Sequence, residues 1–404
     1  MKTKPERSQI KTEQGPGVEL ARNERRDVKI EEKSYFPVML VSAPHIEETF
    51  PETPNKQELE SMPKWRQSLL KWKNQNAAAL NYSMYPGEPT PLRYASAILE
   101  HQVKTGSFPA EQTPEITAVL NPPVFNHQFV NQLIYRLVTD KPKVLAISNL
   151  SESHPYALII AEMAREYSPD TVVILGGKHE TGTHPEMDKE LKPGVAKEKM
   201  DELRTLSTEQ EQKNIDFVVS GDGQYAFYEL VKLVAENPNA SREEIKRLTK
   251  TKLDPKKIQG AGFISFADPD SPIKEGRREI AEVKYEGKNV DYNALPYIGR
   301  DLLYVPNYYP IFLDEKGREK LTAQIMLQHG CFESCSFCCE GMDAKEFISI
   351  SKARLGEKYS GEVSAVRGEM NQRVQKVIEE LKTVTQAGYR ALFLTIAHFC
   401  KMTN

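Results

Sequence analysis

The sequence lacks any apolar run long enough to cross a membrane, since a spanning helix needs roughly 18 or more apolar residues in succession and no stretch approaches that length. It also lacks a secretion signal, because residues 1–33 are polar and charged and contain no apolar h-region. The net charge is only −3, so the composition lacks the excess of basic residues typical of nucleic-acid-binding proteins. We therefore predict a cytoplasmic protein with neither a membrane nor a nucleic acid as partner.

Cysteine is scarce as well, with five residues in 404, yet four of the five lie between Gln328 and Cys339. Clustered free cysteines without a secretion signal fit a reducing cytosol. Cys331, Cys335 and Cys338 have the spacing C-x3-C-x2-C, so three thiolates of one short loop can converge on a metal cluster. A 4Fe-4S cluster normally takes four cysteine ligands, and three would leave one iron open, much as catalytic metal sites keep a free position. We interpret Cys339 as a bystander.

This spacing, with Phe337 just before the third cysteine and Gly330 before the first, resembles the radical S-adenosylmethionine (SAM) enzymes. In that family the open iron chelates SAM, and one electron from the cluster cleaves SAM to a 5′-deoxyadenosyl radical. The resemblance implies that Cys331, Cys335 and Cys338 ligate the cluster, that Phe337 packs beside the cluster or the adenine, and that a low-potential donor such as ferredoxin or flavodoxin supplies the electron. The alternative is a structural zinc site, which usually takes four ligands in paired C-x2-C units; the chain has no second pair.

Upstream of the cysteines, short apolar runs alternate with helical patterns. Buried strands are expected at residues 36–41, 144–148, 171–175, 215–220 and 258–264, and helices at residues 91–100, 125–140, 154–167 and 225–235. Strands this apolar, alternating with helices, predict a parallel sheet covered on both faces. Ligands of such sheets bind beyond the carboxyl ends of the strands.

Loops follow three of these expected strands, at Ser148–His154, at Gly176-Gly177-Lys178-His179 and at Gly221–Gln224, and each leaves a carboxyl end. Glycines let a backbone approach a ligand closely, although a plain tight turn explains them equally well. Placed before a C-x3-C-x2-C loop, such a sheet resembles the cobalamin-binding domain of cobalamin-dependent radical SAM enzymes, with its Gly-Gly-x-His and Asp-Phe-Val-Val-x-Gly-Glu-Gly motifs. The resemblance implies that the corrin or its nucleotide tail contacts Gly176, Gly177, His179, Gly221 and Gly223. 

The chain has no Asp-x-His-x-x-Gly sequence, the motif by which methionine-synthase-like domains supply a histidine to cobalt. The resemblance therefore implies a corrin held without a protein imidazole beneath it. His154 and His179 are then expected near the cofactor but not on the cobalt.

The fold class that follows is α/β: an N-terminal Rossmann-like parallel-sheet cobalamin-binding domain, then an incomplete (β/α) radical SAM barrel. We expect a disordered tail at 1–34, the cobalamin-binding domain at 35–260, a linker at 261–320 and the barrel start at 321–404. Its first strand is expected at 323–327, a helix at 371–387 and a second strand at 389–394. 

A closed barrel needs about 200 residues or more, and the chain ends at Asn404, soon after Cys338. The last ten residues do not continue the family pattern. We therefore expect a truncation within the barrel, caused by a frameshift near Leu394 in a pseudogene or by a sequencing error.

Two further segments are interpreted from composition. Residues 45–92 predict an irregular insertion that ends in the helix at 91–100, with Trp65 and Trp72 in its core. The basic stretch at 246–257 is expected to be solvated surface.

The intact family acts on a small-molecule substrate, by methyl transfer or cyclisation at an unactivated carbon. Methylthio transfer to RNA is disfavoured, because it needs a second cluster with three upstream cysteines, and residues 1–330 contain none. The remaining alternative is a catalytically incompetent fragment that binds cobalamin or an iron–sulfur cluster.

Overall fold

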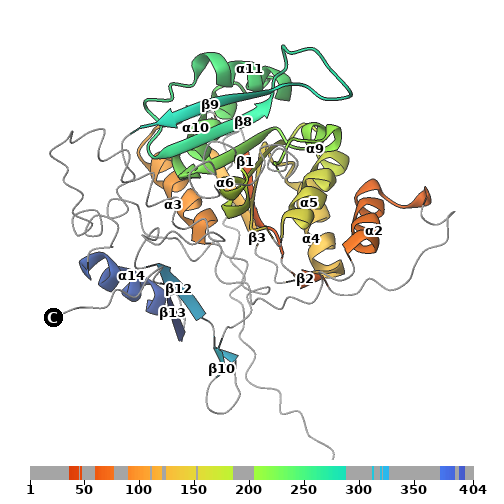
Figure 1. The fold of residues 1–404 in the computed structure, drawn as a ribbon. Coiled ribbons are helices and arrows are strands. Elements are labelled where there is room, and N and C mark those ends of the chain that lie inside the picture. Colours follow the sequence, from red (N-terminus) through yellow and green to blue (C-terminus); the bar gives the residue numbers. More distant parts are fainter. Residues whose placement is uncertain are drawn as a thin grey trace, which may run out of the picture. The chain divides into compact units, whose positions relative to one another are not determined.

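The computed structural model describes residues 36–44, 46–47, 60–76, 90–109, 112–120, 124–151, 153–184, 204–287, 312–313, 319–320, 322–326, 374–386 and 391–395. These residues form an α/β protein around a mixed sheet of seven strands, in the order β3-β1-β5-β6-β7-β8-β9 (Figure 1). The strands are β1 (Phe36–Ser42), β3 (Pro114–Leu120), β5 (Val144–Asn149), β6 (Val172–Gly177), β7 (Phe217–Gly221), β8 (Ala261–Ala267) and β9 (Ile280–Glu286).

The first five strands of that order are parallel, β8 pairs with β7 in antiparallel fashion, and β9 pairs with β8 in antiparallel fashion. The expected parallel sheet is thus confirmed for its main part and extended by two antiparallel strands. Numbered along the chain, the five parallel strands lie in the order 2-1-3-4-5, one of the two common doubly wound orders. The order reverses direction between β1 and β5, and such a switch point is where doubly wound sheets bind ligands.

Both faces of the sheet are buried, as the apolar runs predicted. In β1, Val38 and Leu40 belong to one core cluster, and Met39 and Val41 belong to the other. This division follows from strand geometry, because successive side chains point to opposite faces. A strand buried on both faces is therefore apolar at every position.

Helices cover the two faces. One face carries α3 (Thr90–Lys104), α10 (Gly223–Glu236) and α11 (Arg242–Lys252), and the other carries α2 (Lys64–Asn76), α4 (His127–Thr139), α5 (His154–Tyr167) and the short α9 (Glu209–Asn214) (Figure 1). Helix α4 begins after Asn126, whose side chain accepts a hydrogen bond from the Phe129 amide, so this helix starts two residues later than expected.

The insertion at 45–92 was expected to be irregular, and this expectation was wrong for residues 64–76, which form α2. Trp65 of α2 is buried, and its ring lies 6.4 Å from that of Phe125. Trp65 is thus a core residue, as predicted. Phe125 belongs to β4 (Val124–Phe125), which pairs with β2 (Ile46–Glu47). The side chain of Trp72 lies outside the described set.

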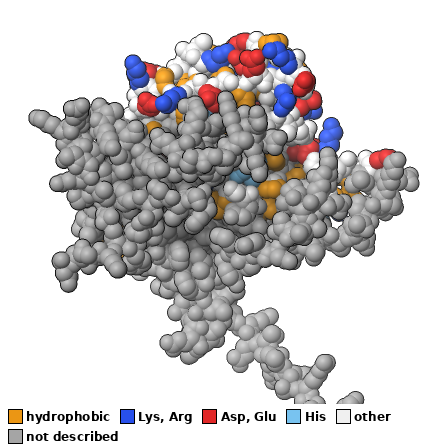
Figure 2. All heavy atoms as spheres, in the orientation of Figure 1, with side chains coloured by type: hydrophobic (Ala, Val, Ile, Leu, Met, Phe, Trp, Pro, Cys, Tyr) orange, Lys and Arg blue, Asp and Glu red, His pale blue; other side chains and the backbone are white. Residues whose placement is uncertain are grey.

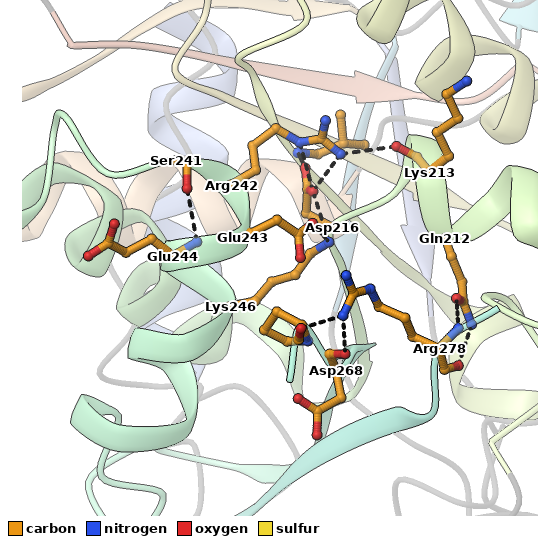
Figure 3. A network of polar contacts seen from close by, with 12 residues as sticks. Gln212, Lys213, Asp216, Ser241, Arg242, Glu243, Glu244, Lys246, Asp268 and Arg278 are labelled. Atoms are coloured by element: carbon orange, nitrogen blue, oxygen red, sulfur yellow. Dashed lines mark hydrogen bonds and ion pairs between the residues drawn. The ribbon is translucent and has the colours of Figure 1, made fainter. Parts of the chain in front are cut away.

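A buried carboxylate at the start of β7 holds several elements together (Figure 3). Asp216 is fully buried, and it accepts hydrogen bonds from Arg165 at 2.6 Å, from Arg242 at 2.9 Å and from the Val173 amide at 2.9 Å. Lys246 Nζ lies 3.5 Å from the same carboxylate. Burial alone would raise the pKa of Asp216, but the three cations outweigh it and hold the pKa below the usual value.

Lys246 was expected on a solvated surface, and that expectation was wrong. Lys246 is only 1% exposed, because α11 directs its side chain inward to Asp216. The prediction of a solvated surface holds for Lys250 and Arg247, which pair with Asp268 and Asp270 at the surface. On the face in view, Lys and Arg side chains alternate with Asp and Glu over this part of the chain (Figure 2).

Separate short elements follow the sheet. Strand β10 (Phe312–Leu313) pairs with β11 (Glu319–Lys320) in antiparallel fashion. Strand β12 (Thr322–Met326) pairs in parallel with β13 (Ala391–Thr395), and α14 (Val374–Gln386) lies between them in the chain and contacts β12. The two strands and the helix expected for this region are confirmed. No helix in the described part of the chain combines the length and apolarity that a membrane span requires.

Candidate functional site

The carboxyl ends of β5, β6 and β7 lie side by side at one edge of the sheet, where the strands end at Asn149, Gly177 and Gly221. All the candidate cofactor residues predicted upstream of the cysteines lie at or just after these ends. The edge also includes the switch point between β1 and β5, where Ala43 donates a backbone hydrogen bond to Ser148 at 2.9 Å. Strand order and residue placement therefore make this edge the candidate site.

Two histidines from different elements stack at the edge. His154 is the first residue of α5, and His179 lies in α6 (Lys178–Gly182), the short helix that follows β6. Their ring centroids are 3.9 Å apart, with an interplanar angle of 26°. The sequence placed both residues after strands, and the fold brings their side chains into contact.

A buried acid completes the cluster. Glu180, next to His179, is 2% exposed, and its Oε1 lies 3.5 Å from His154 Nδ1. The Asn149 amide nitrogen lies 2.9 Å from the same His154 nitrogen and donates to Glu180 Oε1 at 3.3 Å. Ser151 Oγ is 3.2 Å from His179 Nδ1. Each polar side chain of the cluster thus contacts at least one other member.

The charge of Glu180 is stabilised within this cluster. Burial would raise the pKa of the Glu180 carboxyl, but the hydrogen bond from His154 and the charges of both imidazoles outweigh burial and lower it. A protonated Nδ1 of His154 donates to Glu180, whereas an unprotonated Nδ1 accepts from the Asn149 amide.

The helix that carries His179 and Glu180 is fastened to the neighbouring strand. Ser220 Oγ donates to the Glu180 carbonyl at 3.0 Å, and Thr181 Oγ1 accepts from the Gly221 amide at 3.0 Å. These bonds tie α6 to β7 on the side away from α5. The position of the cluster is therefore fixed by backbone contacts as well as by its own side chains.

Three of the predicted glycines have a packing role inside the chain. Gly177 has φ +126°, and a Cβ there would lie 2.2 Å from the Asn149 carbonyl oxygen. Gly221 has φ +85°, and a Cβ there would lie 2.2 Å from the Ala261 carbonyl oxygen. At Gly223 a Cβ would meet a Val219 methyl group at 2.9 Å. These positions need glycine for contacts between neighbouring strands and turns.

Gly176 differs from the other three. Its φ is not left-handed, and among the described residues a Cβ there would meet Val219 alone, at an ordinary distance of 3.5 Å. The packing of the described chain therefore does not require glycine at this position. A bare backbone here is a feature that fits a ligand lying against the strand end.

The cysteine loop itself, with Cys331, Cys335, Cys338 and Phe337, lies outside the described residues. The described chain reaches Met326 at the end of β12, five positions before Cys331. The nearest described strand before the loop, β12, pairs in parallel with β13.

A second histidine–carboxylate pair lies outside this cluster. His184 Nε2 is 3.0 Å from Glu282 Oε1, and Arg204 and Ser265 bond to the same oxygen. Burial would raise the pKa of Glu282, but the hydrogen bond from His184 and the charge of Arg204 hold it at about 2. The His184 ring stacks on Phe263, with centroids 4.0 Å apart. Among the described residues this pair includes one imidazole, so it is less suited to holding a metal than the cluster at His154.

Sequence reasoning found the two stacked histidines but missed Asn149, Ser151 and Glu180. Glu180 directly follows His179, and Asn149 directly follows the strand expected at 144–148, so the sequence offered a signal for both positions. Their approach to His154 depends on where α5 and α6 begin, which the apolar pattern does not determine.

No protein-family model matches the chain, and no curated protein matches it. What the fold and the site define is an α/β protein with a doubly wound sheet and a histidine–carboxylate cluster at its carboxyl edge.

Proposed function

We propose that the chain is a cobalamin-dependent radical SAM enzyme acting on a small-molecule substrate. The observation that carries the proposal is the C-x3-C-x2-C spacing of Cys331, Cys335 and Cys338. Three thiolates on one loop suit a 4Fe-4S cluster with one open iron. The cysteines are the proposed cluster ligands, and Phe337 is proposed to pack beside the cluster or SAM.

The doubly wound sheet supports the corrin part of the proposal. Its strand order has a switch point between β1 and β5, which is the usual ligand position in such sheets. Gly176, Gly177, His179, Gly221 and Gly223 border the same edge. In this arrangement Gly177 and Gly221 keep the strand ends close together, and Gly176 leaves room for the ligand.

The parallel β12–α14–β13 unit supports the barrel part. When bound, the cluster supplies the electron that cleaves SAM reductively, and the corrin carries a methyl group or steers a cyclisation. The protein's own task is to hold these groups, orient the substrate and exclude water. Reduction requires a low-potential donor, proposed to be a ferredoxin or a flavodoxin.

Anaerobic reconstitution with iron, sulfide and hydroxocobalamin tests the proposal. The full chain should retain corrin through gel filtration and release 5′-deoxyadenosine from SAM after reduction. Cys335→Ala should lose SAM cleavage and keep the corrin, because the two cofactors use different segments. If the parent chain retains corrin but does not cleave SAM, it is a cobalamin-binding fragment and not the proposed enzyme. If it neither retains corrin nor cleaves SAM, the whole proposal is wrong.

A further inference from the structure

The stacked histidines and their buried acid have the composition of a metal site. One donor atom from each of His154, His179 and Glu180 lies within 4.8 Å of the other two. We propose that these three residues bind a divalent transition-metal ion, at a site separate from the cysteine loop.

The spacing of the donors suits this role. Bonds of about 2.0–2.2 Å from zinc to nitrogen or oxygen place neighbouring ligands of a tetrahedral site about 3.3–3.5 Å apart. His154 Nδ1 and Glu180 Oε1 are 3.5 Å apart. Binding then requires the two imidazole planes, now 26° apart, to open so that both lone pairs converge on the ion. It also requires the Asn149 amide nitrogen to turn away from His154 Nδ1 and Glu180 Oε1, which accept its hydrogens in the metal-free cluster.

Burial and charge point to a cation. The Glu180 side chain is 1% exposed and is paired with His154 and Asn149; buried charges are either paired in this way or coordinate a metal. Two neutral imidazoles and one carboxylate neutralise only part of the charge of a bound divalent ion. The same ligand set, two histidines and one glutamate, holds zinc in catalytic sites.

An unused acceptor lies beside the three donors. Asn149 is 3% exposed, and its Oδ1 is buried without a hydrogen-bond partner among the described residues. Its amide nitrogen already contacts His154 and Glu180, so the oxygen belongs to the same cluster. A water molecule on the metal would donate to this oxygen and satisfy it.

The surroundings orient the ligands. Ser151 Oγ contacts Nδ1 of His179, which assigns metal coordination to Nε2 of that ring. His154 has a side-chain exposure of 15%, so an ion can reach the cluster from solvent. Two imidazoles and a carboxylate select zinc, iron(II) or cobalt(II) over magnesium and calcium, which prefer oxygen ligands.

Cobalt(II) binding tests the site in a background that lacks the four cysteines of the loop. The probe is CoCl2 added to the full chain carrying Cys331→Ala, Cys335→Ala, Cys338→Ala and Cys339→Ala. We expect one cobalt per chain, no thiolate-to-cobalt charge-transfer band, and a thermal midpoint that rises with cobalt concentration. Because no cluster, SAM or corrin takes part, failure here is separate from failure of the proposed enzyme.

Variants in the same background identify the ligands. Glu180→Gln and His179→Ala should weaken cobalt binding by roughly 100-fold or more, whereas His184→Ala, in the other histidine–carboxylate pair, should leave it unchanged. Unchanged affinity in Glu180→Gln would overturn the assignment. The chain that lacks the four loop cysteines but keeps His154, His179 and Glu180 gives a test that does not depend on the folding of these variants. If cobalt does not raise the thermal midpoint of that chain, the proposed metal site is overturned.

Discussion

Arg165 Nη2 of α5 lies 2.6 Å from Asp216 Oδ2 at the start of β7, and both side chains are almost fully buried. Burial lowers the pKa of Arg165 to about 10 even with the carboxylate beside it. Arg242 and Lys246 of α11 approach the same carboxylate (Figure 3). Asp216 thus joins α5 on one face of the sheet to α11 on the other. The buried charges stabilise the fold only while all of them are present, because removal of one leaves the others unpaired.

Asp216→Asn should therefore lower the free energy of unfolding by about 3–5 kcal/mol, because it leaves buried cations without their counter-ion. Urea denaturation measures the change. The matched control is Asp270→Asn, which breaks an ion pair with Arg247 whose side chains are 53% and 51% exposed; it should leave the urea midpoint almost unchanged. Equal costs for the two variants would contradict the structural role of Asp216.

Two adjacent glycines should respond differently to alanine. Gly177→Ala forces a side chain into a left-handed φ and against the Asn149 carbonyl, so it should cost about 1–3 kcal/mol of stability. Gly176→Ala meets only ordinary contacts and should change stability by less than about 0.5 kcal/mol. If the corrin lies against this strand end, Gly176→Ala should nevertheless weaken corrin retention. A stable variant with undiminished corrin binding would remove Gly176 from the cofactor site.

Glu282 should make stability depend on pH in the acid range. Its folded pKa is about 2, below the ordinary 4.5, so its stabilising effect is complete above pH 4.5 and is lost as the pH falls towards 2. The stability difference between the parent and Glu282→Gln should shrink across that window. Arg204→Gln, which keeps the carboxyl but removes one cation, should reduce the pH dependence. A difference that stays constant from pH 6 to pH 2 would contradict the assignment.

Alanine substitutions should distinguish the proposed cluster ligands from Cys339. Cys335→Ala removes one of three proposed cluster ligands, and it should abolish the broad visible absorbance of the reconstituted cluster. Cys339→Ala lies outside the C-x3-C-x2-C spacing and should leave that absorbance intact. Loss of absorbance in both variants would mean that the proposed ligand set is wrong.

Much of the sheet could be predicted from apolar runs alone. Strands β1, β5, β6 and β7 are buried on both faces, and such strands are recognisable because nearly every residue is apolar. The edge strands were missed for the opposite reason. β3 begins with Pro-Glu, and β9 alternates polar with apolar residues and is largely exposed, so neither has the pattern of a buried strand.

The candidate site was predictable only in part. Turns after strands located His154 and His179 at one edge, because the carboxyl ends of parallel strands lie together. The stacking of the two rings and the approach of Glu180 depend on the first turns of α5 and α6, which no periodic pattern specifies. The inward turn of Lys246 was missed for a related reason, since a basic run does not indicate which of its members meets a buried acid.

The metal content of the anaerobically purified chain tests the central claim most directly. Three cysteines holding a cluster predict about four iron and four acid-labile sulfide per chain after reconstitution, without zinc in the cysteine loop. Zinc bound at Cys331, Cys335 and Cys338, with iron and sulfide absent, would contradict the account.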